Sequence, residues 1–546
     1  MLKPRRTSAT CWAITQSTAR SKTAALACAA LLACALPARS ETVTLQSVLA
    51  SRTAALKSMQ AHPANTLQVI GTIVGAGLQG HFHTWFSAQG QRYDQTIGMR
   101  TQSMLRKADG RLFALDENDN LREIKGLILQ RQHTQDFIDD EKFPSQPQYD
   151  KFKGEQTLPD GRRTFAIVVQ PPDGLPEEID LDQKTFMIDR LSYDDADGTS
   201  TTDFYDYKVF GGSLVALREI DSNGDHDFDL TRVSEHILVD RQIPAVVFDL
   251  PKNNEVQTQA PVTVKLTDRA GHYFTTVNIH GHDYTFLVDT GAQGIVLDAH
   301  VAQQLGLHPE GRLEVSGATR VGGLGIAALD GLHVGSALLP LKSVSVLDLH
   351  NVMGAFQPDG VLGYPFFASA EVQIDAAHET MTFARPGALH APGSPIAIDV
   401  DRQMIETQGK VNGVGGRFIL DTGNSGELLL YGPFMSAHPN LLPAEMHPFA
   451  NSFGVGGAAQ ALTAYVDELD LSSYRFFNRF SNVMLSKQGA FADRFDAGNI
   501  GMGVLRNLIM TYDVANAQAY AAQSSQFDDG RYRSRTENNE SLTIPH

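Results

Sequence analysis

Two copies of the triplet Asp-Thr-Gly are the residues in this chain whose types and spacing best support chemistry. They are Asp289-Thr290-Gly291 and Asp421-Thr422-Gly423. Each follows three large apolar residues, Phe286-Leu287-Val288 and Phe418-Ile419-Leu420, which predicts a buried strand that ends at a carboxylate. Two carboxylates held about 3 Å apart cannot both ionise, so such a pair shares one proton and contains both a base and an acid. A pair of this kind can activate water without a metal or a nucleophilic side chain.

The other residues of each triplet have a predicted supporting role. Thr290 and Thr422 can hydrogen-bond from one triplet to the other and hold the two carboxylates close together. Gly291 and Gly423 let backbone amides approach the acid oxygens, since a Cβ atom there would crowd the turn. We therefore expect Asp289 and Asp421 to be the catalytic residues.

The two triplets belong to a longer internal match. The segment 281–288 aligns without a gap to 413–420, and Val321-Gly322-Gly323 corresponds to Val455-Gly456-Gly457. Further along, the Gly-x-x-Gly segment 360–363 corresponds to 498–501. Three matched landmarks in the same order predict two duplicated lobes related by a pseudo-twofold axis.

On these residues, the region from about 262 to 521 resembles the aspartic-peptidase superfamily, in particular bacterial exported retropepsin-like proteins with two lobes in one chain. The resemblance implies two acid-protease β-barrel lobes whose Asp-Thr-Gly loops meet at the axis. It also implies that the glycine hairpins are substrate-binding flaps, formed by Val321, Gly322, Gly323, Val455, Gly456 and Gly457. An extended peptide or protein would be the substrate, the protein would be a monomer, and neither a cofactor nor a metal would be needed.

The sequence departs from the family pattern in two places. Asn499 stands where that pattern prefers an apolar residue. Neither glycine hairpin contains the aromatic residue that many two-lobed members place over the paired carboxylates. Both departures bear on activity.

The preceding region, residues 41–250, alternates short β-like runs with turn signals, which predicts an antiparallel sheet. The runs include 68–74, 164–169 and 214–220, and the turn signals are Asp109-Gly110, Asp160-Gly161 and Asn223-Gly224. This region resembles half-barrel proteins of the lipoprotein-carrier type. The acidic segment 221–229 could be a calcium loop, but its glycine and last carboxylate do not fit an EF-hand, so a hairpin turn is favoured.

The sequence therefore predicts a mainly β protein with several parts. They are a signal peptide (1–40), an N-terminal β-rich domain (41–250), a linker (251–262), lobe 1 (263–390), lobe 2 (391–521) and a mobile polar tail (522–546). Because prosegments precede enzymes of this kind, the N-terminal domain is expected to cover the site or to present substrate.

The first 40 residues indicate export to the periplasm or the exterior. Basic residues precede an alanine-rich apolar run, and Ala38-Arg39-Ser40 suits signal cleavage. The segment 31–34 also resembles a lipobox, so contact with a membrane is expected only if Cys34 is lipidated. The formal net charge of -17 becomes more negative once this basic segment is removed, which argues against a nucleic-acid partner.

Other hydrolase classes lack their motifs. No His-Glu-x-x-His, Gly-x-Ser-x-Gly or phosphate-binding loop occurs in the sequence. One alternative remains: a non-catalytic periplasmic protein that binds peptides or lipids in the same bilobal cleft. Two intact triplets favour the enzyme, because a pure binding protein has no need to keep two costly close carboxylates.

Overall fold

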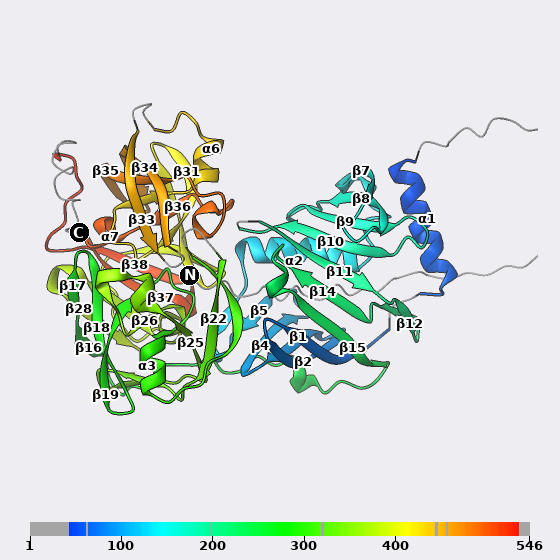
Figure 1. Ribbon diagram of the computed structural model, residues 1–546, viewed down its shortest axis with the longest axis horizontal. Coiled ribbons are helices and arrows are strands. Elements are labelled where there is room, and N and C mark those ends of the chain that lie inside the picture. The colour runs from blue at the N-terminus through cyan, green and yellow to red at the C-terminus, as the bar shows by residue number, and fades with distance from the viewer. Residues whose placement is uncertain are drawn as a thin grey trace, which may run out of the picture.

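The computed structural model describes residues 43–61, 64–196, 198–317, 321–442, 446–454 and 457–533. Figure 1 shows an N-terminal β body beside a larger C-terminal β body, so the predicted mainly β fold is confirmed. The signal segment, with Cys34 and Ser40, lies outside the described residues. Within the described ranges no helix combines the length and apolar character needed to cross a membrane.

The N-terminal body is built on one antiparallel sheet that curves as a half-barrel, as expected. Its strand order is β6-β5-β4-β3-β2-β1-β15-β14-β11-β10-β9-β8-β7. The strands are β1 (Leu67–Gly75), β2 (Leu78–Ser87), β3 (Gly90–Ile97), β4 (Arg100–Lys107), β5 (Leu112–Leu115), β6 (Leu121–Glu123), β7 (Asp150–Thr157), β8 (Arg163–Val169), β9 (Glu177–Asp182), β10 (Ile188–Asp194), β11 (Thr199–Tyr205), β14 (Arg218–Ser222) and β15 (Leu230–Val239), with β12 (Lys208–Phe210) and β13 (Ser213–Val215) forming a separate pair.

Two helices in this body were not predicted. Helix α1 (Leu45–Ser58) starts at a capping box made by Thr44 and Ser47, and α2 (Gly126–Asp139) follows β6. Val48 of α1 and Ile138 of α2 are buried in the same apolar cluster as strands β8 to β11. The apolar spacing of α2 is hard to recognise in the sequence because polar side chains, such as that of Gln135, are buried on it too.

The hairpin turns at Asp109-Gly110 and Asp160-Gly161 are confirmed, since they join β4 to β5 and β7 to β8. The run 214–220 was wrongly predicted as one strand, because it breaks between β13 and β14. In the acidic segment 221–229, Asp225 caps a short 3-10 helix and Asp229 binds His226. Its carboxylates therefore serve the connection between β14 and β15.

The C-terminal half repeats one order of elements. Its first part contains β16 (Val262–Lys265), β17 (Thr267–Arg269), β18 (His272–Ile279), β19 (His282–Val288), β20 (Val296–Asp298), α3 (Ala299–Gln304), β21 (Glu310–Ser316), β22 (Val321–Ala328), β23 (Leu332–Val334), β24 (Ala337–Leu339), β25 (Ser343–Leu347), α4 (Leu349–Val352), β26 (Gly360–Leu362), α5 (Tyr364–Ser369), β27 (Glu371–Asp375) and β28 (Thr380–Ala384). Its second part contains β29 (Ser394–Asp401), β30 (Met404–Val411), β31 (Val414–Leu420), β32 (Leu428–Leu430), α6 (Gly432–Ala437), β33 (His447–Gly454), β34 (Gly457–Leu471), β35 (Tyr474–Met484), β36 (Gly498–Ile500), α7 (Met502–Leu505), β37 (Leu508–Asp513) and β38 (Gln518–Gln523).

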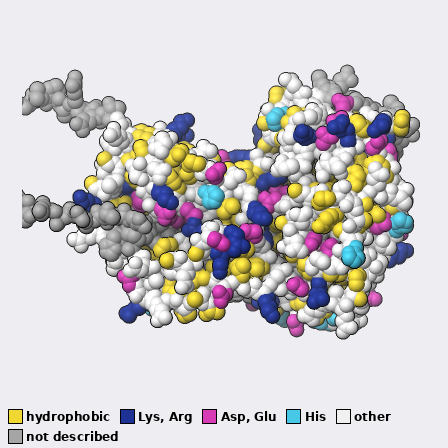
Figure 2. All heavy atoms as spheres, turned by 180° about the vertical axis from the view of Figure 1, so that it is seen from behind, with side chains coloured by type: hydrophobic (Ala, Val, Ile, Leu, Met, Phe, Trp, Pro, Cys, Tyr) yellow, Lys and Arg dark blue, Asp and Glu magenta, His cyan; other side chains and the backbone are white. Residues whose placement is uncertain are grey.

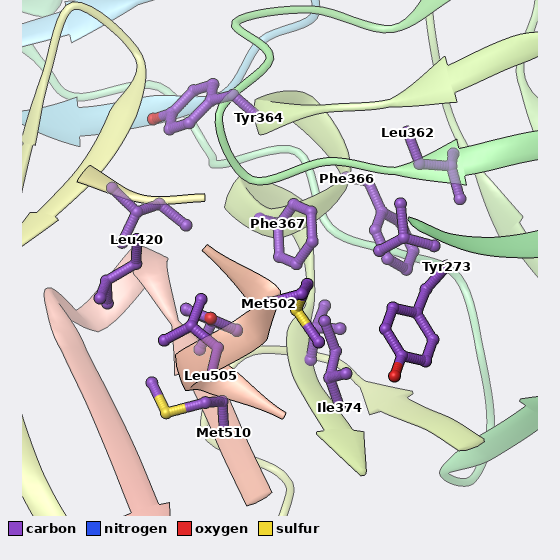
Figure 3. Close-up of a cluster of buried hydrophobic side chains, with 14 of the residues drawn as sticks. Tyr273, Leu362, Tyr364, Phe366, Phe367, Ile374, Leu420, Met502, Leu505 and Met510 are labelled. Atoms are coloured by element: carbon purple, nitrogen blue, oxygen red, sulfur yellow. The ribbon is translucent and has the colours of Figure 1, made fainter. Parts of the chain in front are cut away.

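A shared sheet and a shared core join these two parts. The strand order β16-β28-β27-β37-β38-β29 continues from one part into the other, and β27 pairs with β37. Side chains from both parts meet in one buried cluster, in which Phe367 of the first part lies beside Met502 of the second (Figure 3). Burying this apolar surface fixes the two parts against each other.

Two segments that were predicted from their polar composition pack against the core. In the linker 251–262, Val256 is buried and its amide donates to the Ser369 carbonyl at 2.8 Å. The tail is not mobile from residue 522, since residues 523–533 pack on lobe 2. Phe527 contacts the rings of Tyr474 and Phe476 there, an apolar anchor that the polar composition of the segment obscured.

The N-terminal body packs directly against the hairpin formed by β21 and β22. Ile73 and Leu78 share a buried apolar cluster with Leu313 and Leu324 of this hairpin. The Arg312 amide donates to the Ala76 carbonyl at 2.8 Å. The β21–β22 hairpin therefore belongs to lobe 1 and also to an apolar cluster shared with the N-terminal body.

The same body also touches lobe 2. The Arg494 amide donates to the Ala196 carbonyl at 2.8 Å, and the Arg494 guanidinium pairs with Asp194 at 2.9 Å. On the other side, the Arg122 guanidinium donates to the Val400 carbonyl at 3.0 Å. The N-terminal body thus bridges both lobes.

Leu324→Ala should loosen this hairpin. Removing a side chain that is 3% exposed takes away about 2–4 kcal/mol of packing, so amide exchange in β21 and β22 should become faster in the full chain. Hydrogen exchange read by mass spectrometry measures this. Leu238→Ala is the control, because Leu238 is 38% exposed on β15. Equal hairpin exchange in the two variants would contradict the packing role.

Candidate active site

The two Asp-Thr-Gly loops follow strands that are paired with their neighbours in equivalent ways. Strand β19 lies between β18 and β26, antiparallel to the first and parallel to the second, and β31 is placed in the same way between β30 and β36. The Asp289 amide donates to the Leu362 carbonyl at 3.0 Å, and the Asp421 amide donates to the Ile500 carbonyl at 2.9 Å. The Gly-x-x-Gly segments found in the sequence therefore support the two loops.

The threonines lock the loops together across the junction. The Thr290 amide donates to Thr422 Oγ1 at 3.0 Å, and the Thr422 amide donates to Thr290 Oγ1 at 2.9 Å. Each hydroxyl in turn donates to a carbonyl of the opposite strand, Thr290 to Leu420 at 2.6 Å and Thr422 to Val288 at 2.9 Å. Both threonines are almost fully buried, so these bonds are not exchanged with water.

Each carboxyl group lies against the glycine of the opposite loop. A Cβ atom on Gly423 would lie 2.3–2.5 Å from the carboxyl atoms of Asp289, and one on Gly291 would lie 2.6–3.1 Å from those of Asp421. The Gly291 amide donates to Asp289 Oδ1 at 2.8 Å, and the Gly423 amide donates to Asp421 Oδ1 at 3.0 Å. Only glycine fits at either position.

The electrostatics of the pair follow from burial and proximity. Burial raises the pKa of Asp289 and raises that of Asp421 well above its ordinary value, and the charge of Asp289 adds to the second shift. Each carboxyl group thus lies close enough to the other to affect its pKa. Such a pair titrates as a unit and holds one proton over a wide pH range.

Lobe 2 adds two amide side chains that lobe 1 lacks. Asn499 Nδ2 donates to Asp421 Oδ2 at 2.7 Å, while Asn424 Nδ2 donates to Asn499 Oδ1 at 2.7 Å. The role of Asn424 was missed. Its position directly after the second triplet is the feature of the sequence that could have indicated this role.

The predicted flap residues are only partly described. Val321, Gly322 and Gly323 begin β22, where they pair with Ser316, Val315 and Glu314 of β21. Gly457 begins β34, opposite Gly454, whereas Val455 and Gly456 lie outside the described residues.

The first hairpin also reaches the opposite lobe. The Gly317 carbonyl, at the end of its first strand, accepts from the Ala490 amide of lobe 2 at 2.9 Å. This hairpin thus spans the junction between the lobes.

A buried ionic network in lobe 2 was not predicted. Arg402 pairs with Asp493 and Asp496, and Arg417 pairs with Asp496 at 2.6 Å and Glu406 at 2.9 Å. Tyr431 is within electrostatic range of this network and of Asp421, since its pKa is raised first by burial and then by the charges of Asp496, Asp493 and Asp421.

No metal centre accompanies the pair in the described part of the chain. There, no group of three or more His, Cys, Asp or Glu side chains is arranged to hold an ion. Two paired carboxyl groups can transfer protons to and from a bound water or substrate.

Comparisons with known proteins agree in part with this geometry. A family model described as aspartyl protease matches residues 275–366. No curated protein matches the chain. Among solved structures, an aspartic proteinase from Irpex lacteus is 13% identical with a TM-score of 0.29, and the match covers 49% of this chain and 98% of that one.

Two further solved structures match the chain. A DUF1329 family protein from Desulfovibrio piger is 14% identical with a TM-score of 0.27, covering 37% of this chain and 97% of that one. A domain from Vibrio parahaemolyticus, titled as an outer membrane lipoprotein-sorting protein domain, is 9% identical with a TM-score of 0.27, covering 37% and 95%. The site assignment therefore rests on the geometry of this chain.

Thr422→Val should destabilise the junction between the lobes. The valine has nearly the same shape, but it leaves the Thr290 amide and the Val288 carbonyl without their partners, at a cost of about 1–3 kcal/mol each. Equilibrium urea unfolding measures the loss. Thr422→Ser, which keeps the hydroxyl, should retain most of the stability. A similar midpoint for both variants would show that the cross-junction bonds contribute little.

Asp421→Asn should gain stability relative to the wild type as pH rises. A carboxyl group with a raised folded pKa contributes stability that is fully present below its unfolded pKa and is lost as pH rises through its folded pKa. Asparagine does not titrate, so it escapes this loss. Urea unfolding of both proteins between about pH 3 and 8 tests the trend. A constant difference in unfolding free energy would mean that the pKa is not raised by folding.

Proposed function

We propose that the protein is an aspartic-type endopeptidase in which Asp289 and Asp421 hydrolyse peptide bonds through an activated water. One observation carries the proposal: two carboxyl groups meet at a junction locked by Thr290 and Thr422, each against the glycine of the opposite loop. The aspartyl protease match over residues 275–366 is consistent with it.

The mechanism follows from one shared proton. The ionised carboxylate removes a proton from water while the water oxygen attacks the peptide carbonyl carbon, and the protonated carboxyl group donates to the carbonyl oxygen. The carbon–nitrogen bond then breaks, the amine leaves with a proton, and the pair returns to its single-proton state. Because the threonines and glycines fix both groups beforehand, little reorganisation is needed during the reaction.

The substrate class proposed is an extended peptide or protein segment. An extended backbone can pair with the β21–β22 and β33–β34 hairpins by strand addition. The formal net charge of -17 argues against a nucleic-acid partner. Acidic and basic side chains are interspersed on the face shown in Figure 2.

We also propose that the protein is exported to the periplasm or exterior and acts as a monomer, with membrane attachment only through a lipid on Cys34.

The alternative, a binding protein for peptides or lipids that uses the same bilobal arrangement, has one point in its favour. Asp421 is only 3% exposed, so of the two aspartates it is the less accessible to a substrate. Cleavage assays separate the two functions.

The N-terminal domain is proposed to control access to the paired carboxyl groups. Support comes from its packing against the β21–β22 hairpin and from its contact with lobe 2 through Arg494.

Asp289→Asn should abolish peptide cleavage while the fold is retained. The amide has the same shape but can neither act as the base nor share the proton, so the rate should fall by about 10³-fold or more. The assay incubates mature protein with a mixed peptide library, with and without an aspartic-peptidase transition-state analogue, and detects products by mass spectrometry. Asp330→Asn, the same change at an exposed position of lobe 1, is the control and should cleave normally. Undiminished cleavage by Asp289→Asn would remove Asp289 from the mechanism.

A further inference from the structure

The two aspartates of the pair have unequal surroundings. In lobe 1 the residue after the triplet is Ala292, and the middle residue of the supporting segment is Val361. In lobe 2 the corresponding residues are Asn424 and Asn499. Backbone pairing is the same, because Leu287 lies opposite Val361 as Ile419 lies opposite Asn499. The difference is therefore one of side-chain chemistry alone.

The two asparagines form a directed chain of hydrogen bonds that ends on the second aspartate. The Gly426 amide donates to Asn424 Oδ1 at 2.8 Å, Asn424 Nδ2 donates to Asn499 Oδ1 at 2.7 Å, and Asn499 Nδ2 donates to Asp421 Oδ2 at 2.7 Å. A backbone amide can only donate, so the first bond sets the direction of the others. The orientation of the Asn499 amide is thereby fixed, with its NH₂ group toward the carboxyl group.

Packing restricts the movement of both asparagine side chains. Asn499 is only 1% exposed. A Cβ atom on Gly501 would lie 2.7 Å from the Asn424 side chain, so the close approach requires glycine there. The hydrogen bonds of Asn424 and Asn499 are therefore not readily replaced by bonds to water.

As a result, both oxygens of Asp421 accept hydrogen bonds. Oδ1 accepts from the amides of Gly423 and Asn424, at 3.0 and 3.1 Å, and Oδ2 accepts from Asn499. No equivalent side-chain donor is available from Ala292 or Val361 to Asp289. Donors on both oxygens lower the pKa of a carboxyl group, so these bonds oppose the larger effects of burial and the charge of Asp289, which raise the pKa of Asp421.

We propose that Asn499, oriented by Asn424, is a positioning residue that holds Asp421 as the hydrogen-bond acceptor of the catalytic pair and stabilises the pair's singly ionised state. This inference rests on the proposed peptidase function and deepens it. It also assigns a role to the position at which the sequence departs from the family pattern.

A purely structural role for Asn499 fits the molecule less well. Lobe 1 forms the same parallel and antiparallel pairings with valine at the equivalent position, so the strand does not need an amide. Asparagine at this buried place needs partners for its donor and acceptor, and it finds one in the catalytic pair itself.

The test is Asn499→Val, which gives lobe 2 the residue of lobe 1. Loss of a donor to the anion should raise the lower pKa of the pair, so the acid limb of the kcat/KM profile should move up by about one pH unit. At its optimum kcat should fall by about tenfold, while KM stays nearly unchanged, because the amide touches Asp421 and not the substrate. Peptide cleavage measured from about pH 3 to 8 provides these values.

Two companion variants sharpen the test. Asn424→Ala should shift the acid limb in the same direction, and the double variant should resemble Asn499→Val alone, since both residues act through one chain. Asn507→Val is the matched control. Asn507 is a buried amide of lobe 2 that bonds the Gly503 and Val504 carbonyls, so its loss should lower stability without moving the acid limb.

The outcomes separate this inference from the proposed function. An acid limb that stays in place in Asn499→Val, while Asp289→Asn abolishes cleavage, would overturn the positioning role and leave the peptidase intact. If the wild type cleaves nothing, urea unfolding as a function of pH still decides. The stability difference between the wild type and Asn499→Val should grow as pH rises through the lower pKa of the pair. A difference independent of pH would overturn the inference.

Discussion

The arrangement depends on keeping two like-charged acids against each other, with Asp421 buried and Asp289 half-buried. Water and mutual repulsion would separate Asp289 and Asp421, and burial alone would make either one costly to ionise. The molecule meets this cost with one shared proton and with backbone amides aimed at the carboxyl oxygens. The reciprocal bonds of Thr290 and Thr422 then prevent the loops from moving apart. The shared sheet through β27 and β37 serves the same purpose on a larger scale.

The two lobes have kept this backbone arrangement while their side chains have diverged. Phe274 lies opposite Leu287 in an apolar cluster of lobe 1. The equivalent residue of lobe 2 is Glu406, which lies opposite Ile419 and joins the buried network of Arg402 and Arg417. Equivalent strand positions are therefore apolar in lobe 1 and charged in lobe 2.

The sequence predicted those features that are repeated or local. The two triplets, their apolar strands and the Gly-x-x-Gly supports were visible because each has a counterpart in the other lobe. Features that depend on contacts between distant segments were not visible. Examples are Phe527, whose apolar contact lies within a polar tail, and helix α2, whose buried face includes Gln135. Tertiary packing decided these cases where local pattern could not.

The hairpin that belongs to two cores changes how the chain can be divided. By composition the boundary between the N-terminal body and lobe 1 lies near residues 251–262, but Leu313 and Leu324, beyond that boundary, are covered by Ile73 and Leu78. A fragment that starts after the boundary would expose those leucines to water and would risk self-association. The lobes and the N-terminal body must therefore be engineered as one unit. A part can be exchanged only together with the surface that covers it.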